Sequence, residues 1–295
     1  MPDLKRSLDR LAETIKLTVS GPGSYATPVP GVKVHCRNKT NQPENCFFKP
    51  LATLIVQGEK RTIWGADEFT YGAGWLVINA VQLPSASSIT QGSDAKPFLG
   101  ISLELDHQLL TRLTAEILTP PPPVPGRAVA VFPADLDLVN AYLRLAQLAD
   151  KPNEITVLAP LITSEIHYRS LIGPAGGVLR ALNHAGGQSH QVAKAIAWLR
   201  DNFKQPLYVE ELARRVNMAP STFHRHFRDL TTLSPLNYQK RLRLYEAQRL
   251  MMVEQLDAAS ASLAVGYESP SQFNREYKRL FGDSPRRDVT HRMKK

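Results

Sequence analysis

Cysteine is scarce in this chain: its 295 residues contain only Cys36 and Cys46. The two are not paired in a CxxC motif and have no histidines at zinc-ligand spacing, so the sequence indicates neither a redox pair nor a zinc-binding module. The alternating run VKVHCR (32–37) places Cys36 on the apolar side of a strand, as a small core residue. Sensing of oxidants or electrophiles by Cys36 or Cys46 stays open, because no sequence feature marks it.

Long hydrophobic runs are absent. No stretch approaches the roughly twenty consecutive apolar residues of a membrane span. The start, MPDLKRSLDRLAE, is charged and lacks the apolar core of a signal peptide, so no export is implied. We therefore expect a cytoplasmic protein that does not enter a membrane.

Catalytic motifs are missing as well. The sequence has no GxSxG, no P-loop and no dinucleotide glycine pattern. The β-rich part offers only His35 and His107 as metal ligands, without an HxH pair or a partnering glutamate. Strand alternation predicts that His35 points outward, and LDHQLL predicts that His107 begins a surface helix. We expect no enzyme, no metal and no cofactor.

Acidic residues are outnumbered toward the carboxyl end. Residues 189–295 hold 19 Lys and Arg against 11 Asp and Glu, whereas residues 1–188 hold 17 against 16. The net charge of +9 therefore lies almost entirely in one segment. Such an excess indicates contact with a polyanion. The alternative, a basic surface that only keeps the protein soluble, stays open on charge alone.

The first part of the chain has the pattern of a β domain. Alternating runs such as VKVHCR and ISLEL (101–105) have the period of two that is typical of strands. Frequent Gly, Pro and Ser punctuate them, which predicts a sandwich or barrel over residues 1–118. Trp64, Trp75, Phe69 and Tyr71 either line a pocket in this domain or fill its core.

A proline-rich stretch, TPPPPVPG (119–126), ends the β pattern. After it, DLDLVNAYLRLAQLAD and EITVLAPLITSEIHYRSLI carry apolar residues at helical spacing, which predicts a helical connector over residues 119–188. Residues 189–295 read as short helices and form the basic domain.

The basic domain contains an internal repeat. PSTFHRHFRDLTTLSP (220–235) and PSQFNREYKRLFGDSP (270–285) agree in register at Pro, Ser, Phe, Arg, Leu, Ser and Pro. On a helix that begins at the first proline, one face of each copy is apolar and the opposite face is polar and basic. The inward sets are Phe223, Phe227 and Leu230 in the first copy, and Phe273, Tyr277 and Leu280 in the second.

A short helix and a tight turn precede each copy, as VEELARRV with NMA and as AASASLAV with GYES. A short helix, a turn and a second helix with a basic outer face form a helix-turn-helix unit, whose second helix fits the major groove of DNA. The helix predicted from LNYQKRLRLYEAQRLMM would rise about 25 Å and hold the two units on adjacent groove segments.

These stretches together resemble the paired helix-turn-helix domain of AraC-family transcription regulators. In the front half, TPVPGVKV, LIVQGEKR, YGAGWLVINAVQLP and KPFLGISLELD resemble the N-terminal region of one AraC subfamily. The resemblance implies an α+β multidomain fold: an N-terminal β-rich cupin-like barrel, a helical connector and a C-terminal all-α domain with two helix-turn-helix units.

The resemblance also implies which side chains contact double-stranded DNA. The early, exposed positions of the two recognition helices would read bases: Ser221, His224, Arg225, Ser271, Asn274 and Arg275. Arginine matches guanine and asparagine matches adenine by paired hydrogen bonds, which supports this assignment independently. Other cations would contact phosphates and position the protein without reading sequence: Arg228, Lys240, Arg241, Lys278 and Arg279. For any one of them a solvated surface charge is the alternative.

Three residues distinguish the first unit from the second. Asn217 stands where the second unit has Gly266, and Thr232 stands where it has Gly282. Ala219 lacks the capping oxygen of its counterpart Ser269, a loss of about 1 kcal/mol. Asparagine tolerates a left-handed backbone, whereas the β-branched Thr232 would be strained there. We therefore expect the first unit to be the less stable of the two.

The expected function is sequence-specific regulation of transcription through two adjacent major grooves. A small molecule bound in the N-terminal domain would change DNA binding. As alternatives, that domain only dimerises or docks another protein, or the chain is a metal-dependent cupin enzyme. The resemblance implies an activator, a homodimer and contact with RNA polymerase. The operator, the regulated genes and the effector are not readable from the sequence.

Overall fold

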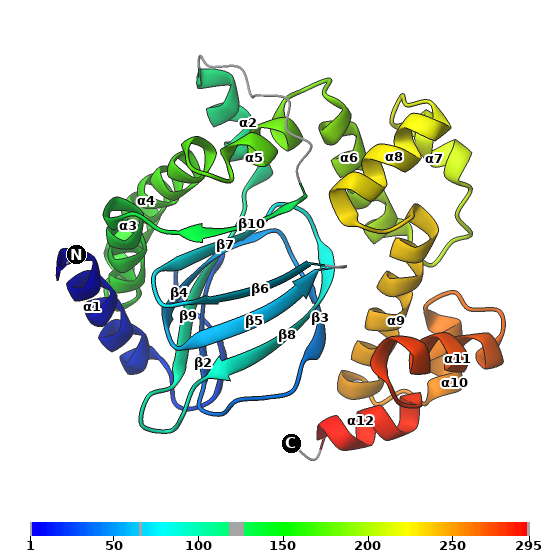
Figure 1. The fold of residues 1–295 in the computed structure, drawn as a ribbon, viewed down its shortest axis with the longest axis horizontal. Helices are drawn as coiled ribbons and strands as arrows, with labels where there is room; N and C mark the ends of the chain where they lie inside the picture. The colour runs from blue at the N-terminus through cyan, green and yellow to red at the C-terminus, as the bar shows by residue number, and fades with distance from the viewer. Residues whose placement is uncertain (1, 65–66, 118–126, 294–295) are drawn as a thin grey trace. The chain divides into compact units, whose positions relative to one another are not determined.

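The computed structural model describes residues 2–64, 67–117 and 127–293, and the proline-rich break at 119–126 lies outside them. The chain divides into two compact units, residues 1–190 and residues 191–295. Figure 1 shows the elements of both.

Two antiparallel sheets form the centre of the first unit, which confirms the β-rich fold predicted from the sequence. The six-stranded sheet has the order β1 (Gly23–Ala26), β2 (Val32–Arg37), β9 (Phe98–Glu104), β4 (Leu51–Gln57), β7 (Trp75–Asn79) and β10 (Val129–Pro133). The four-stranded sheet has the order β3 (Glu44–Phe48), β8 (Leu83–Gln91), β5 (Glu59–Trp64) and β6 (Asp67–Gly72).

Helices lie beside the six-stranded sheet (Figure 1). They are α1 (Pro2–Thr18), α2 (His107–Glu116), α3 (Leu136–Gln147), α4 (Pro152–Ile172) and α5 (Gly176–Asn183), with a 3₁₀ turn at Leu148–Asp150. The hydroxyl of Tyr142 in α3 donates to the carbonyl of Ala52 in β4 at 3.0 Å, and Leu11 and Ile15 of α1 are fully buried. The apolar core of the unit therefore lies between this sheet and its helices.

The apolar face of the six-stranded sheet is the one that packs on the helices. Val34, Cys36, Leu54 and Ile101 are buried on it. Cys36 thus has the core position that the alternation predicted. The opposite face, which carries the neighbours of these residues along each strand, lines the space between the two sheets.

The segment after the proline-rich break joins the same unit. Strand β10 pairs with β7, with Val129 opposite Asn79 and Pro133 opposite Trp75. Residues that the sequence placed in a separate connector therefore complete the six-stranded sheet. The strand VAVFP was not recognised, because five residues between a proline run and a helix are too short to show a period. The predicted boundaries at 118 and 188 stay predictions.

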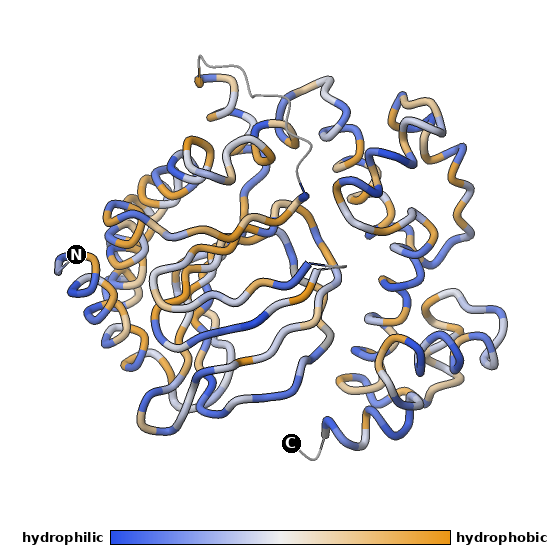
Figure 2. Tube along the Cα trace, in the orientation of Figure 1, coloured by the Kyte–Doolittle hydropathy of each residue, from blue (hydrophilic) through white to orange (hydrophobic). Residues whose placement is uncertain are grey.

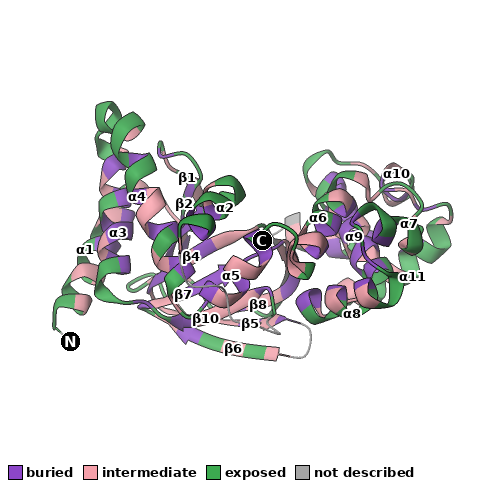
Figure 3. Cartoon of the chain, turned by 90° about the horizontal axis from the view of Figure 1, so that it is seen from above, coloured by how far each residue is buried: buried purple, intermediate pink, exposed green. Residues whose placement is uncertain are grey.

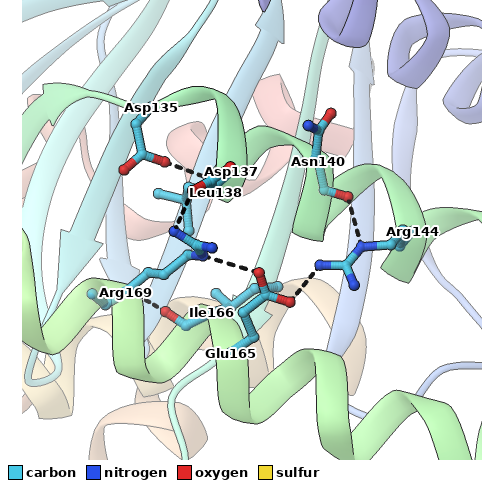
Figure 4. Close-up of polar contacts among 9 residues, drawn as sticks. Asp135, Asp137, Leu138, Asn140, Arg144, Glu165, Ile166 and Arg169 are labelled. Atoms are coloured by element: carbon cyan, nitrogen blue, oxygen red, sulfur yellow. Dashed lines mark hydrogen bonds and ion pairs between the residues drawn. The ribbon is translucent and has the colours of Figure 1, made fainter.

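An ion-pair network ties α3 to α4 (Figure 4). Glu165 of α4 accepts from Arg144 of α3 and, at 3.0 Å, from Nε of Arg169, while Nη1 of Arg169 reaches Asp137 of α3 at 3.0 Å. Burial by itself would raise the pKa of Glu165, but the two guanidiniums outweigh it and hold this pKa below its usual value. The network fixes the register of the two helices.

The second unit is helical throughout its described residues. Its helices are α6 (Gln188–Asn202), α7 (Val209–Arg215), α8 (Pro220–Thr231), α9 (Pro235–Val253), α10 (Ala258–Ala264), α11 (Pro270–Phe281) and α12 (Pro285–Met293). The order short helix, turn, longer helix occurs twice, as α7–α8 and as α10–α11, and α9 connects the two pairs (Figure 1). No helix among the residues described in either unit is long and apolar enough to cross a membrane.

Candidate nucleic-acid interface

Each helix-turn-helix pair is built on buried aromatic side chains. Phe223 and Phe227 in α8, and Phe273 and Tyr277 in α11, are all 0% exposed. Within each helix the two ring centroids lie 5.5 Å apart. Their spacing of four residues puts them on one face, which confirms the inward sets predicted from the repeat. Because this face is fixed in the core, the opposite face of each helix must point to solvent.

The predicted base-contacting residues all lie on that solvent face. Ser221, His224, Arg225, Ser271, Asn274 and Arg275 are exposed. Figure 3 colours α8 and α11 by the burial of their residues. The structure brings them together as two separate groups, one at the start of α8 and one at the start of α11. Their contact with bases stays a prediction.

The predicted phosphate contacts divide into two classes. Arg228, Lys278 and Arg279 are exposed in the recognition helices, whereas Lys240 and Arg241 of α9 are half-buried. Nζ of Lys240 lies 2.6 Å from Oε1 of Glu276, so its charge is already engaged within the protein.

Glu276 is held by three side chains. Besides Lys240, Tyr267 donates its hydroxyl proton at 2.8 Å, and Gln272 donates through Nε2 at 3.1 Å. Burial would raise the pKa of Glu276, but these donors outweigh it and lower the pKa. The carboxylate therefore joins α9 to α11 and to the turn before it.

The beginnings and ends of the recognition helices differ as the sequence predicted. The hydroxyl of Ser269 accepts from the backbone N–H of Gln272 at 3.3 Å, whereas Ala219 supplies no cap. Asn217 and Thr232 have φ angles of 55° and 64°, the left-handed region disfavoured for side-chain-bearing residues. The left-handed backbone considered for these positions is thus confirmed, and it strains the β-branched Thr232, whereas asparagine tolerates it. Its effect on stability stays a prediction.

Arg243 in α9 has a structural role that the sequence did not indicate. Its Nε donates to the carbonyl of Phe203 at 2.7 Å, and its Nη2 donates to those of Lys204 and Gln205 at 3.1 and 2.9 Å. Its Nη1 donates to Gly266 in the turn of the second pair at 2.7 Å. Burial lowers the pKa of Arg243, although a guanidinium stays charged at neutral pH. No sequence signal separates Arg243 from the neighbouring surface cations, because its partners are backbone carbonyls.

A buried carboxylate anchors the last helix. Oδ2 of Asp288 in α12 accepts from the hydroxyl of Tyr277 at 2.7 Å and from Nε2 of Gln248 at 2.6 Å, and Oδ1 accepts from Arg292 at 2.8 Å. Burial and the nearby carboxylate raise the pKa of Tyr277. The position of α11 thus depends on α9 and α12 together.

A cavity of about 450 Å³ lies between the two sheets of the first unit. Four lining residues are basic and two are acidic; these are Lys33, Arg37, Lys49, Lys60, Glu44 and Glu104. Apolar walls are provided by Leu51, Ile55, Trp64, Val77, Ile89 and Phe98. The first unit therefore contains a space that suits a small ligand rather than a filled interior.

His35 lines this cavity, so the prediction that its ring points outward to solvent is wrong. One ring nitrogen is bonded to the hydroxyl of Ser24 at 2.9 Å and the other to the hydroxyl of Ser102 at 2.8 Å. Burial, followed by the positive charges of Lys60, Arg37 and Lys33, lowers the pKa of His35 from 6.5 to about 4. The error arose because the apolar face of β2 packs on helices, which leaves its polar face inside the barrel. His107, in contrast, begins the exposed first turn of α2 as predicted.

Two of the four aromatic candidates line the cavity. Trp64 and Tyr71 are buried in its wall, and the Tyr71 hydroxyl is bonded to that of Thr62 at 2.7 Å. Phe69 packs edge-on against Trp64, with ring centroids 5.6 Å apart, and like Trp75 it lies outside the lining. Among the described residues, no three His, Cys, Asp or Glu side chains come together as a metal site.

Two family models match the chain. One, described as AraC-type transcriptional regulator N-terminus, matches residues 28–178, and the other, described as helix-turn-helix domain, matches residues 212–289. The first covers just over half of the chain. Together they span both units.

Curated relatives match over part of the chain. The HTH-type transcriptional regulator CdhR of Pseudomonas aeruginosa is 31% identical over 153 residues, which is 52% of this chain and 43% of CdhR. The HTH-type transcriptional activator RhaS of Escherichia fergusonii is 33% identical over 91 residues, 31% of this chain and 33% of RhaS. The aligned stretches thus span less than half the length of these relatives.

Solved structures of ToxT from Vibrio cholerae have a similar fold. An apo form gives a TM-score of 0.59 at 8% identity and covers 88% of this chain and 97% of ToxT. Wild-type ToxT solved with a bound unsaturated fatty acid gives a TM-score of 0.55 at 9% identity, with coverage of 92% and 96%. At these identities the likeness shows the fold alone.

Proposed function

The chain belongs to the family of AraC-type transcriptional regulators, and from this membership we propose that it binds specific double-stranded DNA sites and regulates transcription in response to a small molecule. The observation that carries the proposal is the pair of recognition helices. Both α8 and α11 expose a polar, basic face at their amino-terminal ends and bury the opposite, aromatic face. This is the arrangement that a major groove accepts.

In this proposal, base readout belongs to the first turns of the two helices. The proposed readers are Ser221, His224, Arg225, Ser271, Asn274 and Arg275. A bidentate pair such as arginine with guanine, or asparagine with adenine, contributes about 1–3 kcal/mol of discrimination between bases. Arg228, Lys278 and Arg279 would contact phosphates, with Arg241 at the edge of the interface. Lys240 would contact a phosphate only while its ammonium group also pairs with the carboxylate of Glu276.

The length of α9 supports binding in two successive grooves. This helix has 19 residues, which corresponds to about 28 Å at 1.5 Å per residue. Successive major-groove segments on one face of DNA lie about 34 Å apart. The difference is small enough for modest bending of the DNA to remove it.

We assign the response to a small molecule to the first unit. The cavity between its sheets favours a ligand over a domain that only dimerises or docks a protein. The similar fold of ToxT, solved with a bound unsaturated fatty acid, supports a ligand in this fold. By linkage, the molecule regulates only if it prefers one DNA-binding state of the protein.

We also propose that the protein activates transcription, contacts RNA polymerase and forms a homodimer. RhaS, which is 33% identical over 91 residues, is described as a transcriptional activator. The exposed apolar side chains of α4, such as Val157 and Leu161, suit a second copy of the chain.

Selection from genomic DNA tests the proposal. The purified chain is mixed with sheared DNA of its host at moderate ionic strength, with bulk competitor, and bound fragments are sequenced. We expect a small set of enriched fragments that share a motif with two half-sites. A double variant, Arg225→Ala with Arg275→Ala, should lose this enrichment but keep weak binding to all DNA. No enrichment by the unaltered protein would refute sequence-specific regulation.

A further inference from the structure

Resting on the proposed function, we propose that the cavity between the two sheets binds a small organic carboxylate. Its carboxylate group lies at the β2 side of the cavity, near Arg37 and His35. Its apolar body lies toward β4 and β7, against Ile55 and Val77. The ligand is thus an anion with an apolar body, rather than a neutral sugar-like molecule or inorganic phosphate.

The position of the polar side chains within the sheet supports this orientation. Strand β2 carries Lys33, His35 and Arg37 on its cavity face, and β9 lies between β2 and β4. On the far side of β9, the cavity residues of β4 and β7 include Ile55 and Val77. The lining therefore changes from basic to apolar across the six-stranded sheet. In the opposite sheet, the start of β5 is hydrophilic, in contrast to the hydrophobic β4 and β7 (Figure 2).

Arg37 has the bonding pattern of a residue that is held in place and still charged. Its guanidinium donates to the backbone carbonyls of Gly23 and Cys36 and to the hydroxyl of Ser24 at 3.1 Å. All of these acceptors are neutral, so they orient the guanidinium without neutralising it. An oriented guanidinium binds a carboxylate more strongly than a flexible one does.

Positive charges accumulate around the same point. Lys60 projects from β5 of the opposite sheet into the cavity, and burial lowers its pKa, with Arg37 adding to the effect and Cys46 opposing it. The charges of Lys60, Arg37 and Lys33 also act on His35 and help to keep it neutral. Bringing like charges together away from water is unfavourable, and a bound anion would offset part of that free energy.

The size of the cavity and its apolar walls indicate the size and the apolar character of the rest of the ligand. A volume of about 450 Å³ lies within the range of sites for small organic molecules. Trp64 and Phe98 add to the apolar lining, which an inorganic ion would leave unfilled. Ser102 of β9 and Thr53 of β4 are paired across adjacent strands, and both line the cavity between its two ends. A carboxylate with a ring or a short alkyl chain matches these features.

Calorimetric titration of the full-length protein tests the proposal. The probes are benzoate, 3-phenylpropanoate and octanoate at up to millimolar concentration, together with the three corresponding primary amides and inorganic phosphate. We expect at least one carboxylate to bind at one site per chain, and its amide to bind about ten-fold more weakly or not at all. The Arg37→Met variant should lose about ten-fold in affinity for that carboxylate. Lys16→Met, an exposed cation of α1, should bind as the unaltered protein does.

A second measurement reports on position. Nuclear magnetic resonance of the His35 ring should show its pKa rising from about 4 when the carboxylate binds. When the amide binds, the pKa of His35 should stay at about 4. Binding of the amides as tightly as the acids, binding of phosphate alone, unchanged affinity in Arg37→Met, or no binding by any carboxylate would each overturn the proposal. Genomic DNA selection by the same preparation separates the two hypotheses: if it succeeds while titration fails, the regulator stands and the carboxylate site does not.

Discussion

Arg243 and Gly266 are joined by a hydrogen bond of 2.7 Å from Nη1 of the guanidinium to the glycine carbonyl. Arg243 lies in α9 and Gly266 lies in the turn between α10 and α11. The same guanidinium binds the backbone carbonyls of Phe203, Lys204 and Gln205, which follow α6. One side chain therefore fixes the second helix-turn-helix pair to the first helix of the basic unit.

Replacing Arg243 should destabilise this unit more than replacing a surface arginine. In Arg243→Met, the carbonyls of Phe203 and Gly266 lose their donor, so we expect the free energy of unfolding to fall by about 3 kcal/mol. Arg249→Met is the control on the same helix, because among the described residues Arg249 forms ion pairs only with Glu246 and Glu254, at the surface. This variant should lose about 1 kcal/mol or less. Urea unfolding measures both. Equal losses in the two variants would contradict a special role for Arg243.

Gly266 and Gly282 should respond differently to alanine. Both have left-handed backbones, with φ angles of 90° and 87°. A Cβ at Gly266 would lie 2.2 Å from the carbonyl oxygen of Lys204, whereas a Cβ at Gly282 meets nothing within 4 Å. Gly282→Ala should therefore cost about 1 kcal/mol from backbone strain, and Gly266→Ala about 3 kcal/mol because backbone must also move. Thermal unfolding of the two variants measures both losses. Similar losses would show that the backbone at Lys204 moves away from the new Cβ at little cost in free energy.

The first helix-turn-helix pair should open more readily than the second. Thr232 has a φ of 64° where the second pair has glycine, and Ala219 gives α8 no side-chain cap. Hydrogen exchange should show weaker protection in α8 than in α11. Thr232→Gly should raise the protection of α8 by about 1 kcal/mol, since glycine adopts this backbone without strain. Stronger protection of α8 than of α11 in the unaltered protein would contradict the prediction.

Arg275 and Lys278 should separate base readout from phosphate contact. Both are exposed on α11, one on its first turns and the other later. Arg275→Ala should relax preference at one base pair of the site, with a loss of about 1–3 kcal/mol confined to specific DNA. Lys278→Ala should weaken specific and random DNA alike and lower the slope of log affinity against log salt by about one. Binding assays on both DNAs over a range of salt decide this, and equal loss on both DNAs for Arg275→Ala would make it a phosphate contact.

His35 should make the first unit less stable toward acid pH. Its pKa in the folded protein, about 4, lies below the ordinary 6.5, because of burial and then of Lys60, Arg37 and Lys33. As the pH falls, the unfolded chain takes up the proton first, so stability that is present above pH 6.5 is lost progressively down to pH 4. Ser24 and Ser102, which face the ring from β1 and β9, are uncharged in this range.

The matched variant is His35→Asn, which keeps hydrogen-bonding capacity but does not titrate. Its melting temperature should fall less steeply between pH 7 and pH 5 than that of the unaltered protein. Scanning calorimetry at several pH values measures the difference. Parallel curves for the two proteins would show that His35 is protonated in the folded state or exposed to water.

Local patterns in the sequence were sufficient to predict the recognition helices of the second unit. The spacing of Phe223 and Phe227, repeated at Phe273 and Tyr277, defined both recognition helices and their buried faces, and the structure confirms them. The left-handed positions of Asn217 and Thr232 followed from alignment with two glycines of the second copy. Such features depend on neighbours within a few residues, and the duplication provided an internal comparison.

The same kind of pattern was ambiguous in the first unit. Alternation in β2 correctly separated Val34 and Cys36 from His35 and Arg37, but alternation does not say what lies on either side of a sheet. The apolar side is covered by helices that include residues after the proline-rich break, which leaves the basic side lining a cavity. That choice depends on contacts between segments far apart in the sequence, such as Tyr142 with Ala52, which are 90 residues apart.

The sequence by itself determined the paired helix-turn-helix units, their polar faces and the uneven distribution of charge, because these depend on helical periodicity and composition. Only the tertiary structure decided that Lys33, Arg37 and Lys60 surround one cavity, and that Arg243 binds backbone carbonyls rather than solvent. The physical reason is that a side chain's surroundings are set by which distant segments pack against its strand or helix, and burial of apolar area, not local spacing, selects that packing.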